Sequence, residues 1–408
     1  MHRLSTALGM PQHRFSSVHV VGTNGKSSVT RMTAALLEAH GVSAGACVSP
    51  HAERWSERVL VRGEEVGEAE FAAAVERAAQ AAKNVNRGLE EGDAVTQFEL
   101  ATAAAFAVLA AARVEVAVIE AGLGGRLDAT NTIPSRVTVL TSVGLDHTEW
   151  LGGTEAEIAA EKLAVLRDHS TLVLGQVSGE VEQLAERTAA ERGARLVRAP
   201  ADPGEGVQLR APGRFQRRNF ALAMSAAEAF LGELDPAQVA EVAATLTVPG
   251  RLEQIAESPP TFLDAAHNPD GAAALAEALT ELAPERVRSL LRSAGQKANA
   301  TPVVACLAVL GDKDAKAMVR ALAPAVDRVV CTELDPAVLS SRGLPGALTR
   351  PAGELAAICA EVGLDAEPEP DFPAAMQRGR RLALDTGAIL LVTGSHYALS
   401  PARAALSD

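Results

Sequence analysis

The chain has 408 residues, 48% of them hydrophobic, and carries a formal net charge of −13 at pH 7. This length favours two compact domains, and the acidic excess argues against nucleic acid or an anionic membrane as a partner. Four scattered cysteines without a C-x-x-C pair, and no secretory leader, favour reduced thiols in a cytoplasmic protein. No apolar run is long enough to span a bilayer. Small metabolites are therefore the expected partners.

Short β-branched runs alternate with alanine-rich helical stretches, which is typical of an α/β fold. Pro249 and Gly250 interrupt this pattern, so we expect a junction between two α/β units at about residues 249–256. The polar segment 284–302 is predicted to be an exposed insertion. Buried strands are predicted at 17–21, 114–119, 137–141 and 171–174, and then at 261–263, 303–310, 328–331 and 388–392.

The segment 20–28, VVGTNGKSS, joins the first predicted strand to a helix predicted over 28–40. Such a turn points backbone N–H groups and the positive end of a helix dipole at one place, which suits a polyphosphate. Lys26 adds a cation, and the hydroxyl of Ser27 or Ser28 can reach a magnesium ion. The segment departs from G-x-x-x-x-G-K-[ST] because Val20 occupies the position of the first glycine, so an ordinary glycine-rich turn is the alternative.

Three further polar segments follow apolar stretches of the predicted sheet. Glu120 begins EAGLGGRLDATN, His147 ends GLDH, and Ser49 begins SPH. Ligands collect at the carboxyl ends of parallel strands, so we expect these side chains to form a metal site at one edge. Imidazole is an unusual ligand for magnesium, which leaves manganese or zinc open on chemistry alone.

A lysine lies on the apolar face of the next predicted helix. Thr154 and Glu157 form a capping box that begins this helix, and Lys162 falls among its apolar positions. The stem of Lys162 can pack there while the ammonium reaches water. Alternatively, burial lowers its pKa and leaves a neutral amine that reacts with carbon dioxide, giving an anionic carbamate suited to a metal.

Nine motifs, taken in order, resemble the folylpolyglutamate synthases and dihydrofolate synthases of the Mur ligase superfamily. The resemblance runs from about residue 15 to 400, and EAGLGGRLDATN is its most specific part. It implies a P-loop NTPase-like ATP-binding domain with a central, mostly parallel sheet at residues 1–250, and a smaller Rossmann-like α/β glutamate-ligase domain at 251–408. The motifs are GTNGKSS, SPH, EAGLGGRLDATN, GLDH, TEAEIAAEKLAVL, PGRLE, DAAHNP, GDKD and TGS.

The phosphate loop of this superfamily lacks the earlier glycine, so Val20 is no longer an objection. In the folate branch the residue after the lysine is usually glycine, and here it is Ser27. That difference leaves open whether Ser27 or Ser28 contacts the metal. The family also has a segment before the first strand that contributes to the pteroate pocket, and here about fifteen residues precede Ser17.

The resemblance implies ATP and two magnesium ions as cofactors, and it assigns roles residue by residue. The implied nucleotide contacts are Gly22, Thr23, Asn24, Gly25, Lys26, Ser27, Ser28, Asn219, Arg251 and Asp264. The implied metal ligands are Ser27, Ser28, Ser49, Glu120, His147 and Lys162, the last as a carbamate. The implied catalytic residues are Lys26, Lys162 and His267. The implied substrate contacts are Thr96, Gln97, Phe98, Glu99 and Leu127 in a pterin pocket, together with Ser395.

The implied reaction is ATP-dependent addition of L-glutamate to dihydropteroate and to reduced folates through an acyl phosphate, by a cytoplasmic monomer. The alternatives are a folylpolyglutamate synthase alone, another Mur-type amino-acid ligase, or a P-loop NTPase that uses hydrolysis for movement or signalling. The ending GRLDATN favours the folate branch over the cell-wall branch. A non-ligase NTPase would not need the Lys162 helix or the polar strand ends at Glu120 and His147. Phosphoryl transfer needs positioning and charge neutralisation rather than a covalent nucleophile.

Overall fold

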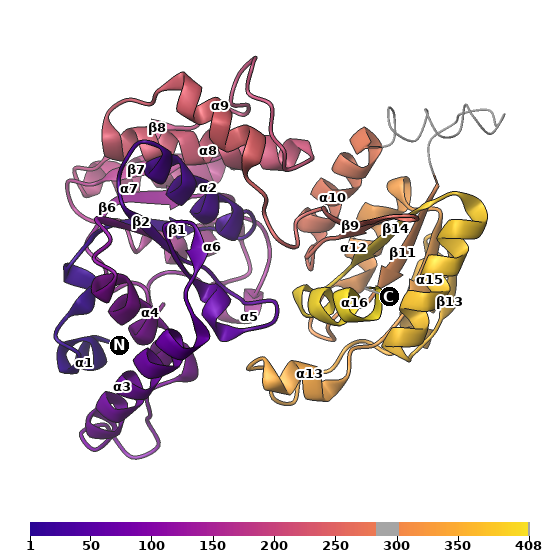
Figure 1. The fold of residues 1–408 in the computed structure, drawn as a ribbon, viewed down its shortest axis with the longest axis horizontal. Helices are drawn as coiled ribbons and strands as arrows, with labels where there is room; N and C mark the ends of the chain where they lie inside the picture. The colour runs from indigo at the N-terminus through magenta and orange to yellow at the C-terminus, as the bar shows by residue number, and fades with distance from the viewer. Residues whose placement is uncertain (283–301, 407–408) are drawn as a thin grey trace. The chain divides into compact units, whose positions relative to one another are not determined.

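The computed structural model describes residues 1–282 and 302–406, so the predicted insertion at 284–302 lies outside the described residues except for Pro302. The chain divides into two compact units, the first being Met1–Arg210 with Gln216–Leu246 and the second Ala211–Phe215 with Thr247–Asp408. Each unit combines a sheet with surrounding helices (Figure 1), which confirms the predicted fold class. The assignment of residues 1–250 and 251–408 to two functional domains remains a prediction. Among the described helices, none combines the length and apolar character needed to cross a membrane.

An eight-stranded sheet forms the centre of the first unit, in the order β4-β3-β2-β5-β1-β6-β7-β8. The pairs β2–β3 and β3–β4 are antiparallel, and the other neighbours are parallel. Strand β1 lies between β5 and β6, with Val18 opposite Val118 and Val137. The strands are β1 (Ser16–Val21), β2 (Ala44–Cys47), β3 (Val59–Val61), β4 (Glu64–Glu65), β5 (Val116–Glu120), β6 (Ser135–Leu140), β7 (Thr171–Leu174) and β8 (Arg195–Arg198).

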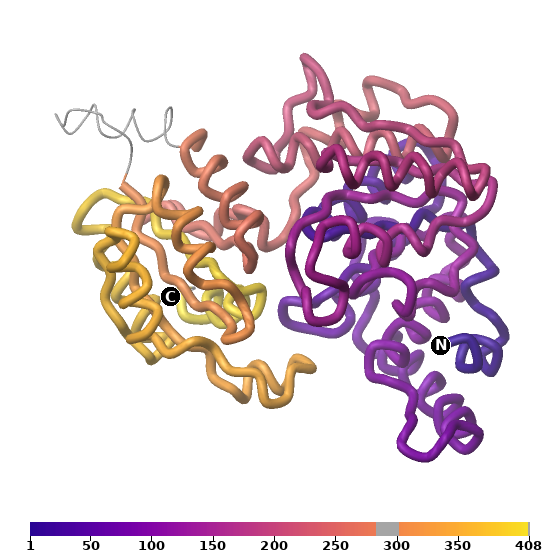
Figure 2. The backbone as a smooth tube through the Cα atoms, turned by 180° about the vertical axis from the view of Figure 1, so that it is seen from behind, coloured from indigo at the N-terminus to yellow at the C-terminus, as the bar shows by residue number. Residues whose placement is uncertain are grey.

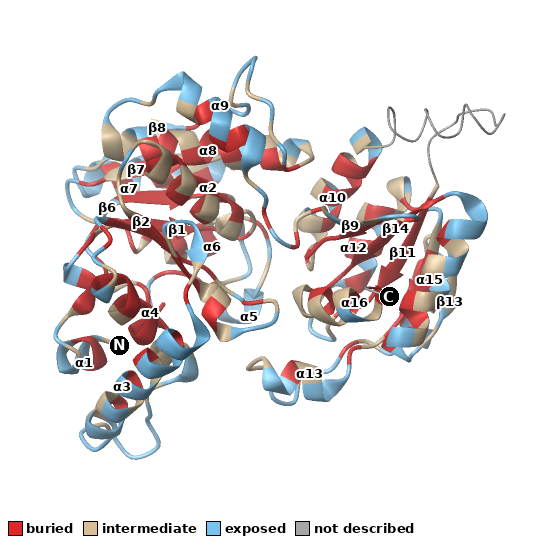
Figure 3. Ribbon diagram, viewed as in Figure 1, coloured by how far each residue is buried: buried red, intermediate tan, exposed pale blue. Residues whose placement is uncertain are grey.

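The helices of this unit are α1 (His2–Ala7), α2 (Lys26–Ala39), α3 (Glu68–Asn86), α4 (Gln97–Ala111), α5 (Thr148–Leu151), α6 (Glu155–Leu163), α7 (Gly179–Glu191), α8 (Arg214–Leu231) and α9 (Pro236–Thr245). Short 3-10 turns are η1 (Pro11–His13) and η2 (Trp55–Arg58). One apolar core packs α3 and α4 against Ala117 and Ile119, and another packs α6 and α7 near Leu140 and Leu172. Figure 3 shows the buried strands in red and the outer helix surfaces in pale blue. The sheet therefore presents its strand ends from a rigid, buried platform.

The second unit contains a six-stranded sheet in the order β13-β12-β11-β14-β10-β9, in which β9 is antiparallel to β10 and the other pairs are parallel. Its path can be followed from behind in Figure 2, from orange to yellow. Its strands are β9 (Glu253–Glu257), β10 (Pro260–Leu263), β11 (Val303–Leu307), β12 (Arg328–Cys331), β13 (Asp365–Pro368) and β14 (Ile389–Thr393). Its described helices are α10 (Pro269–Leu282), α12 (Ala315–Leu322), η3 (Ala323–Ala325), α13 (Pro336–Ser341), α14 (Ala352–Glu361), α15 (Phe372–Thr386), η4 (His396–Ala398) and α16 (Leu399–Leu406).

All eight predicted strands are present: those at 171–174 and 328–331 have the predicted bounds, and the other six have shifted ends. The prediction of a strand over 303–310 was too long, because β11 pairs with β14 only as far as Leu307 and Thr393. The helix predicted from Ser28 begins earlier, at Lys26, because Gly25 makes the turn with a positive φ. The sequence did not reveal the edge strands β8 and β13, whose charged, partly exposed residues give no apolar run.

Candidate functional site

The glycine-rich loop between β1 and α2 is shaped by close contacts that exclude any side chain. Gly22 and Gly25 have φ of +154° and +83°. A Cβ atom on Gly22 would lie 1.8 Å from Thr141 Oγ1, and one on Gly25 would lie 2.5 Å from Asn219 Oδ1. Only glycine fits at either position without strain. The loop is thereby held between the end of β6 and α8, and Asn219 of α8 lies directly against it.

The segment that follows β6 fixes the backbone of the loop. The backbone N–H of Thr23 donates to Ser142 O at 2.8 Å, and the N–H of Gly144 donates to Thr23 Oγ1 at 3.1 Å. The N–H of Asn24 donates to Ser142 Oγ at 3.0 Å, while Thr141 Oγ1 donates to Asn24 O at 2.6 Å. These bonds fix the path of the turn through contacts within the chain itself.

Two lysines from different elements meet at one carbonyl of this loop. Lys26 Nζ donates to Gly22 O and Thr23 O, each at 3.0 Å, and Lys162 Nζ donates to Gly22 O at 3.0 Å. Lys162 is only 4% exposed, so its ammonium does not reach water and snorkelling is excluded. Burial, and secondarily the charge of Lys26, lowers the pKa of Lys162 to about 7. A substantial fraction of Lys162 is therefore a neutral amine near pH 7.

Glu120 is the last residue of β5 and brings two of the predicted segments together. Its Oε1 accepts from Ser27 Oγ at 2.9 Å, and its Oε2 accepts from the backbone N–H of Ser49 at 2.9 Å. Ser28, in contrast, is 1% exposed, and its Oγ has no hydrogen-bond partner among the residues that the structure describes. Of the two serines in question, Ser27 is the one that shares the Glu120 carboxylate.

His147 lies on the connection after β6, three residues beyond Gly144. It is the N-cap of α5 with φ of +52°, and its side chain is 41% exposed. Its Nε2 is 3.9 Å from Asp146 Oδ1. The same connection therefore both shapes the glycine-rich loop and carries this imidazole, but His147 presents it to solvent rather than to a buried position.

The loop between β5 and β6 (residues 121–134, the β5–β6 loop) packs against both α4 and α6. A Cβ atom on Gly122 would lie 2.5 Å from the Phe98 ring, and one on Gly125 would lie 2.6 Å from Glu161 O. Leu127 is 92% exposed on this loop. These close approaches explain why the loop is rich in glycine.

Of the predicted pterin-pocket residues on α4 and its N-cap, Phe98 lines a cavity, whereas Thr96, Gln97 and Glu99 do not line it. Phe98 lines a narrow cavity together with Cys47, Ser49, Arg58, Thr102 and Glu120. Thr96 and Glu99 form the capping box of α4, each accepting the other's backbone N–H, and Gln97 is exposed. Thr96 and Glu99 thus hold the first turn of the helix that presents Phe98.

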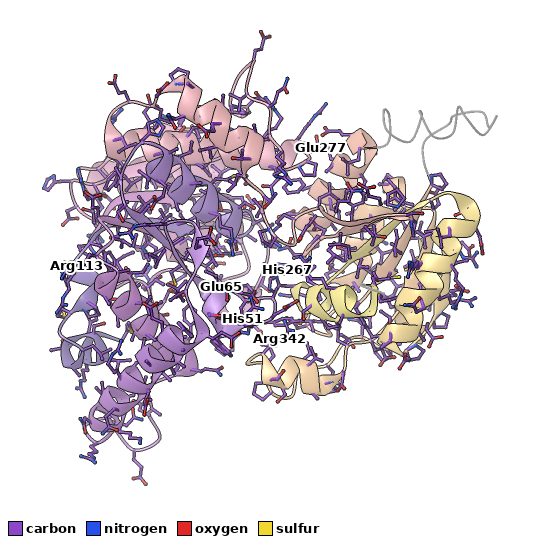
Figure 4. All side chains as sticks on the ribbon, in the orientation of Figure 1. His51, Glu65, Arg113, His267, Glu277 and Arg342 are labelled. Atoms are coloured by element: carbon purple, nitrogen blue, oxygen red, sulfur yellow. The ribbon has the colours of Figure 1, made fainter. Side chains whose placement is uncertain are left out.

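In the second unit, the predicted residues lie at the ends of the neighbouring parallel strands β10 and β14. Asp264 accepts from the backbone N–H groups of Leu252 and Ala266, each at 2.8 Å. Burial raises the pKa of Asp264, and the charge of Arg251 opposes that rise. His267, labelled in Figure 4, donates from Nδ1 to Ala265 O at 2.9 Å.

Ser395 follows β14 and is 1% exposed, and its Oγ accepts from the Tyr397 N–H at 3.2 Å. This bond caps η4, so the hydroxyl of Ser395 has a local structural partner. Asp264, His267 and Ser395 therefore share one edge of the second sheet, while Asn219 belongs to the first unit.

Sequence reasoning named His51 only as part of the polar segment SPH, and it assigned no role to Trp55 or Arg58 beside it. His51 is 3% exposed, accepts from Arg58 Nε at 2.9 Å, and has its ring centroid 4.5 Å from that of Trp55. Arg58 lies 4.3 Å from the Trp55 ring centroid and lines the cavity. Figure 4 labels His51 and Glu65, which come from the segment between β2 and α3. The only signal in the sequence was an aromatic and a basic residue close after SPH.

The chain matches two protein families along its length. Residues 20–199 match the Mur ligase middle domain, and residues 250–396 match the Mur ligase glutamate ligase domain. The dihydrofolate synthase/folylpolyglutamate synthase of Mycobacterium tuberculosis is 35% identical over 372 residues, covering 81% of this chain and 72% of that protein. The folylpolyglutamate synthase of Lacticaseibacillus casei is 31% identical, covering 84% of this chain and 81% of that protein.

Solved structures agree with these matches. Mycobacterium tuberculosis folylpolyglutamate synthase complexed with ADP and AMPPCP is similar with a TM-score of 0.87 and 31% identity, covering 99% of this chain and 93% of that chain. The bifunctional enzyme of Yersinia pestis complexed with AMPPNP and Mn has a TM-score of 0.79 and 28% identity, covering 99% and 92%. The chain therefore belongs to the folylpolyglutamate synthase/dihydrofolate synthase family of the Mur ligase superfamily.

Proposed function

We propose that this protein uses ATP to join L-glutamate to dihydropteroate and to reduced folates or their polyglutamates. As a member of its family it is an ATP-dependent ligase, and the observation that carries the proposed chemistry is the convergence of Lys26, Lys162, Ser27 and Glu120 on the glycine-rich loop. The proposed acids follow from the similarity to dihydrofolate synthase/folylpolyglutamate synthase. We further propose that it acts as a monomer in the cytoplasm on small molecules alone.

The reaction joins a carboxylate to an amine in two steps. The substrate carboxylate attacks the γ-phosphorus of ATP, giving an acyl phosphate and ADP. The glutamate amine then attacks the acyl carbon, and inorganic phosphate leaves as the amine loses a proton. The chain's own part is to bind and neutralise charge: the loop N–H groups and Lys26 hold the phosphates, and no side chain has to form a covalent bond.

The residues around Glu120 fit a divalent metal ion such as magnesium. A buried carboxylate, the Ser27 hydroxyl and Ser49 supply the oxygen atoms that magnesium prefers, and Lys162 would add two more as a carbamate. His147 is the proposed nitrogen ligand. When bound, two such ions would supply positive charge that offsets the charge of the transferred phosphate.

The burial of Lys162 supports its modification. Its neutral amine adds to carbon dioxide and releases one proton, giving an N-carboxylate in place of a buried cation. The remaining nucleotide contacts are proposed for Asn219, Arg251 and Asp264. His267 and Ser395 are the proposed contacts for the reacting glutamate, and Phe98 with Leu127 for the pterin.

A ligation assay tests the proposal directly. The purified chain is incubated with ATP, magnesium and L-glutamate, together with either dihydropteroate or a reduced folate, and the products are separated by mass. We expect a mass increase of one glutamate on each acid. Product from the folate alone would reduce the activity to folylpolyglutamate synthase, and steady ATP hydrolysis independent of glutamate and of either acid would defeat the ligase assignment.

The role of Lys162 has its own test. Lys162→Ala should abolish ligation, and short-chain carboxylic acids should restore part of it by supplying carboxylate oxygens in the vacated space. Lys83→Ala, which removes an exposed lysine of α3, is the matched control and should ligate normally. Full activity of Lys162→Ala without added acid would rule the carbamate out.

A further inference from the structure

A histidine is buried in the central strand of the first sheet. His19 is 0% exposed on β1, where its register partners are Ile119 and Thr138. Burial, reinforced by the charge of Arg167, lowers the pKa of His19 to about 3, so the ring is neutral at pH 7. Burying an imidazole at this position costs desolvation free energy that an apolar side chain would not cost. The hydrogen bonds of His19 therefore need to be examined as the reason for its presence.

The ring is the end of a hydrogen-bonded chain that reaches into the β5–β6 loop. His19 Nε2 is 2.8 Å from Thr130 Oγ1, and Thr130 Oγ1 donates to Asp128 Oδ1 at 2.5 Å. Because Thr130 uses its only proton on the carboxylate, it accepts from His19, which places the imidazole proton on Nε2. Nδ1 of His19 then has no partner among the described residues.

Asp128 closes the β5–β6 loop upon itself. Its Oδ2 accepts from the Leu123 N–H at 2.8 Å, and its Oδ1 accepts from the Thr130 N–H at 2.9 Å. The loop thus depends on a 9% exposed carboxylate, whose orientation the Thr130 hydroxyl fixes. Its far end is held separately, since Arg167 donates to Asn131 O at 2.7 Å.

The hydrogen bonds from His19 through Thr130 to Asp128 connect two loops to the same strand, β1. The phosphate loop begins at Gly22, three residues after His19, while the β5–β6 loop carries Gly122 against Phe98 and the exposed Leu127. We propose that His19 is a positioning residue that, through Thr130 and Asp128, sets the β5–β6 loop relative to the phosphate loop and thereby determines affinity for the pteroyl acid. The inference rests on the proposed function, because it takes the acid to bind against this loop.

The inference predicts a selective loss of acid binding. Thr130→Val is nearly isosteric but removes the linking hydroxyl, and His19→Leu removes the donor. Each should raise the KM for the pteroyl acid roughly tenfold, equivalent to about 1.4 kcal/mol, and change kcat much less. The dissociation constant of ADP, measured by calorimetry, should stay within about twofold of wild type because the phosphate loop has its own tethers.

Conservative variants separate positioning from general damage. Thr130→Ser keeps the hydroxyl, and His19→Gln offers an amide N–H near the position of Nε2, so both should retain near-normal KM values. Equal losses in all four variants, or a rise in the ADP dissociation constant as large as the rise in KM, would overturn the inference. If His19→Leu does not fold, the comparison of Thr130→Val with Thr130→Ser still tests the inference.

Amide hydrogen exchange provides a readout that does not need turnover. In Thr130→Val the Leu123 amide should exchange at least about tenfold faster, because its acceptor Asp128 is no longer oriented. Unchanged exchange at Leu123 would refute the inference even if the ligation assay succeeds. Failure of the wild type to ligate would instead refute the proposed function and leave the exchange result to decide the role of His19.

Discussion

Replacing Lys162 by methionine should make the first unit more stable while removing its activity. The fall of the Lys162 pKa from 10.5 to about 7 corresponds to roughly 5 kcal/mol of unfavourable interaction with the charged form. Methionine keeps most of the volume and loses one hydrogen bond to Gly22 O, a loss of about 1 kcal/mol, and Lys26 still donates to that carbonyl. We therefore expect a net gain of about 4 kcal/mol in the free energy of unfolding at pH 6.

The sign of the pH dependence follows from the same shift. The folded pKa lies below the unfolded value, so between pH 7 and 10.5 the unfolded wild type binds the proton that the folded form has lost. Wild-type stability therefore rises with pH across that window. The advantage of Lys162→Met should be full below pH 7 and fall to about 1 kcal/mol at pH 9, where the charge penalty on wild type is only about 2 kcal/mol. Carbon dioxide must be excluded, because a carbamate would remove the buried cation.

Tryptophan fluorescence during urea unfolding measures the stability of the first unit, which contains Lys162. Both tryptophans of the chain, Trp55 and Trp150, belong to the first unit. A gain of about 4 kcal/mol should raise the urea midpoint by more than about 1 M for a unit of this size. Lys83→Met, an exposed replacement on α3, should unfold like wild type. A midpoint for Lys162→Met at or below that of wild type at pH 6 would refute the argument.

Four further substitutions test the residues at the glycine-rich loop. Glu120→Gln keeps the shape but removes the charge, so ligation should fall by at least about 100-fold while the thermal midpoint changes little. The ligation rate is also measured as a function of magnesium concentration. Ser27→Ala should need roughly tenfold more magnesium for half-maximal rate, whereas Ser28→Ala should behave like wild type because the Ser28 hydroxyl is buried away from Glu120. The reverse ranking of the two variants would contradict the geometry. Gly25→Ala should weaken ADP binding by about tenfold or more, as measured by calorimetry, because φ is +83° and the new methyl meets Asn219 at 2.5 Å. Normal ADP affinity would show that the loop tolerates a side chain.

The sequence alone was enough for the fold class, the glycine-rich turn between β1 and α2 and the polar strand ends. Apolar strands alternating with helices indicate parallel sheets, and parallel sheets bring the carboxyl ends of their strands to one edge. Glu120 and Ser49 could therefore be expected near the loop before any contact was known. The dense, ordered motifs indicated the family, because their spacing is maintained along nearly the whole chain.

Only the tertiary structure showed which of two neighbouring side chains makes a given contact. Ser27 and Ser28 are adjacent in sequence, yet on a helix they point about 100° apart, and only Ser27 meets Glu120. The sequence pattern left Lys162 open between water and the interior, and its contact with Gly22, 140 residues away, settled the matter. Thr96 and Glu99 cap a helix, as Thr154 and Glu157 do, and there the Thr-x-x-Glu pattern could already have been read from the sequence.

His19 shows the same limit most clearly. In the sequence it is one polar residue in an apolar strand, and its partner Thr130 is 111 residues away. Local patterns record how a segment folds because neighbouring residues share one backbone geometry. Hydrogen bonds between distant segments depend on the register of strands and the path of loops, so they exist only once the sheet is assembled.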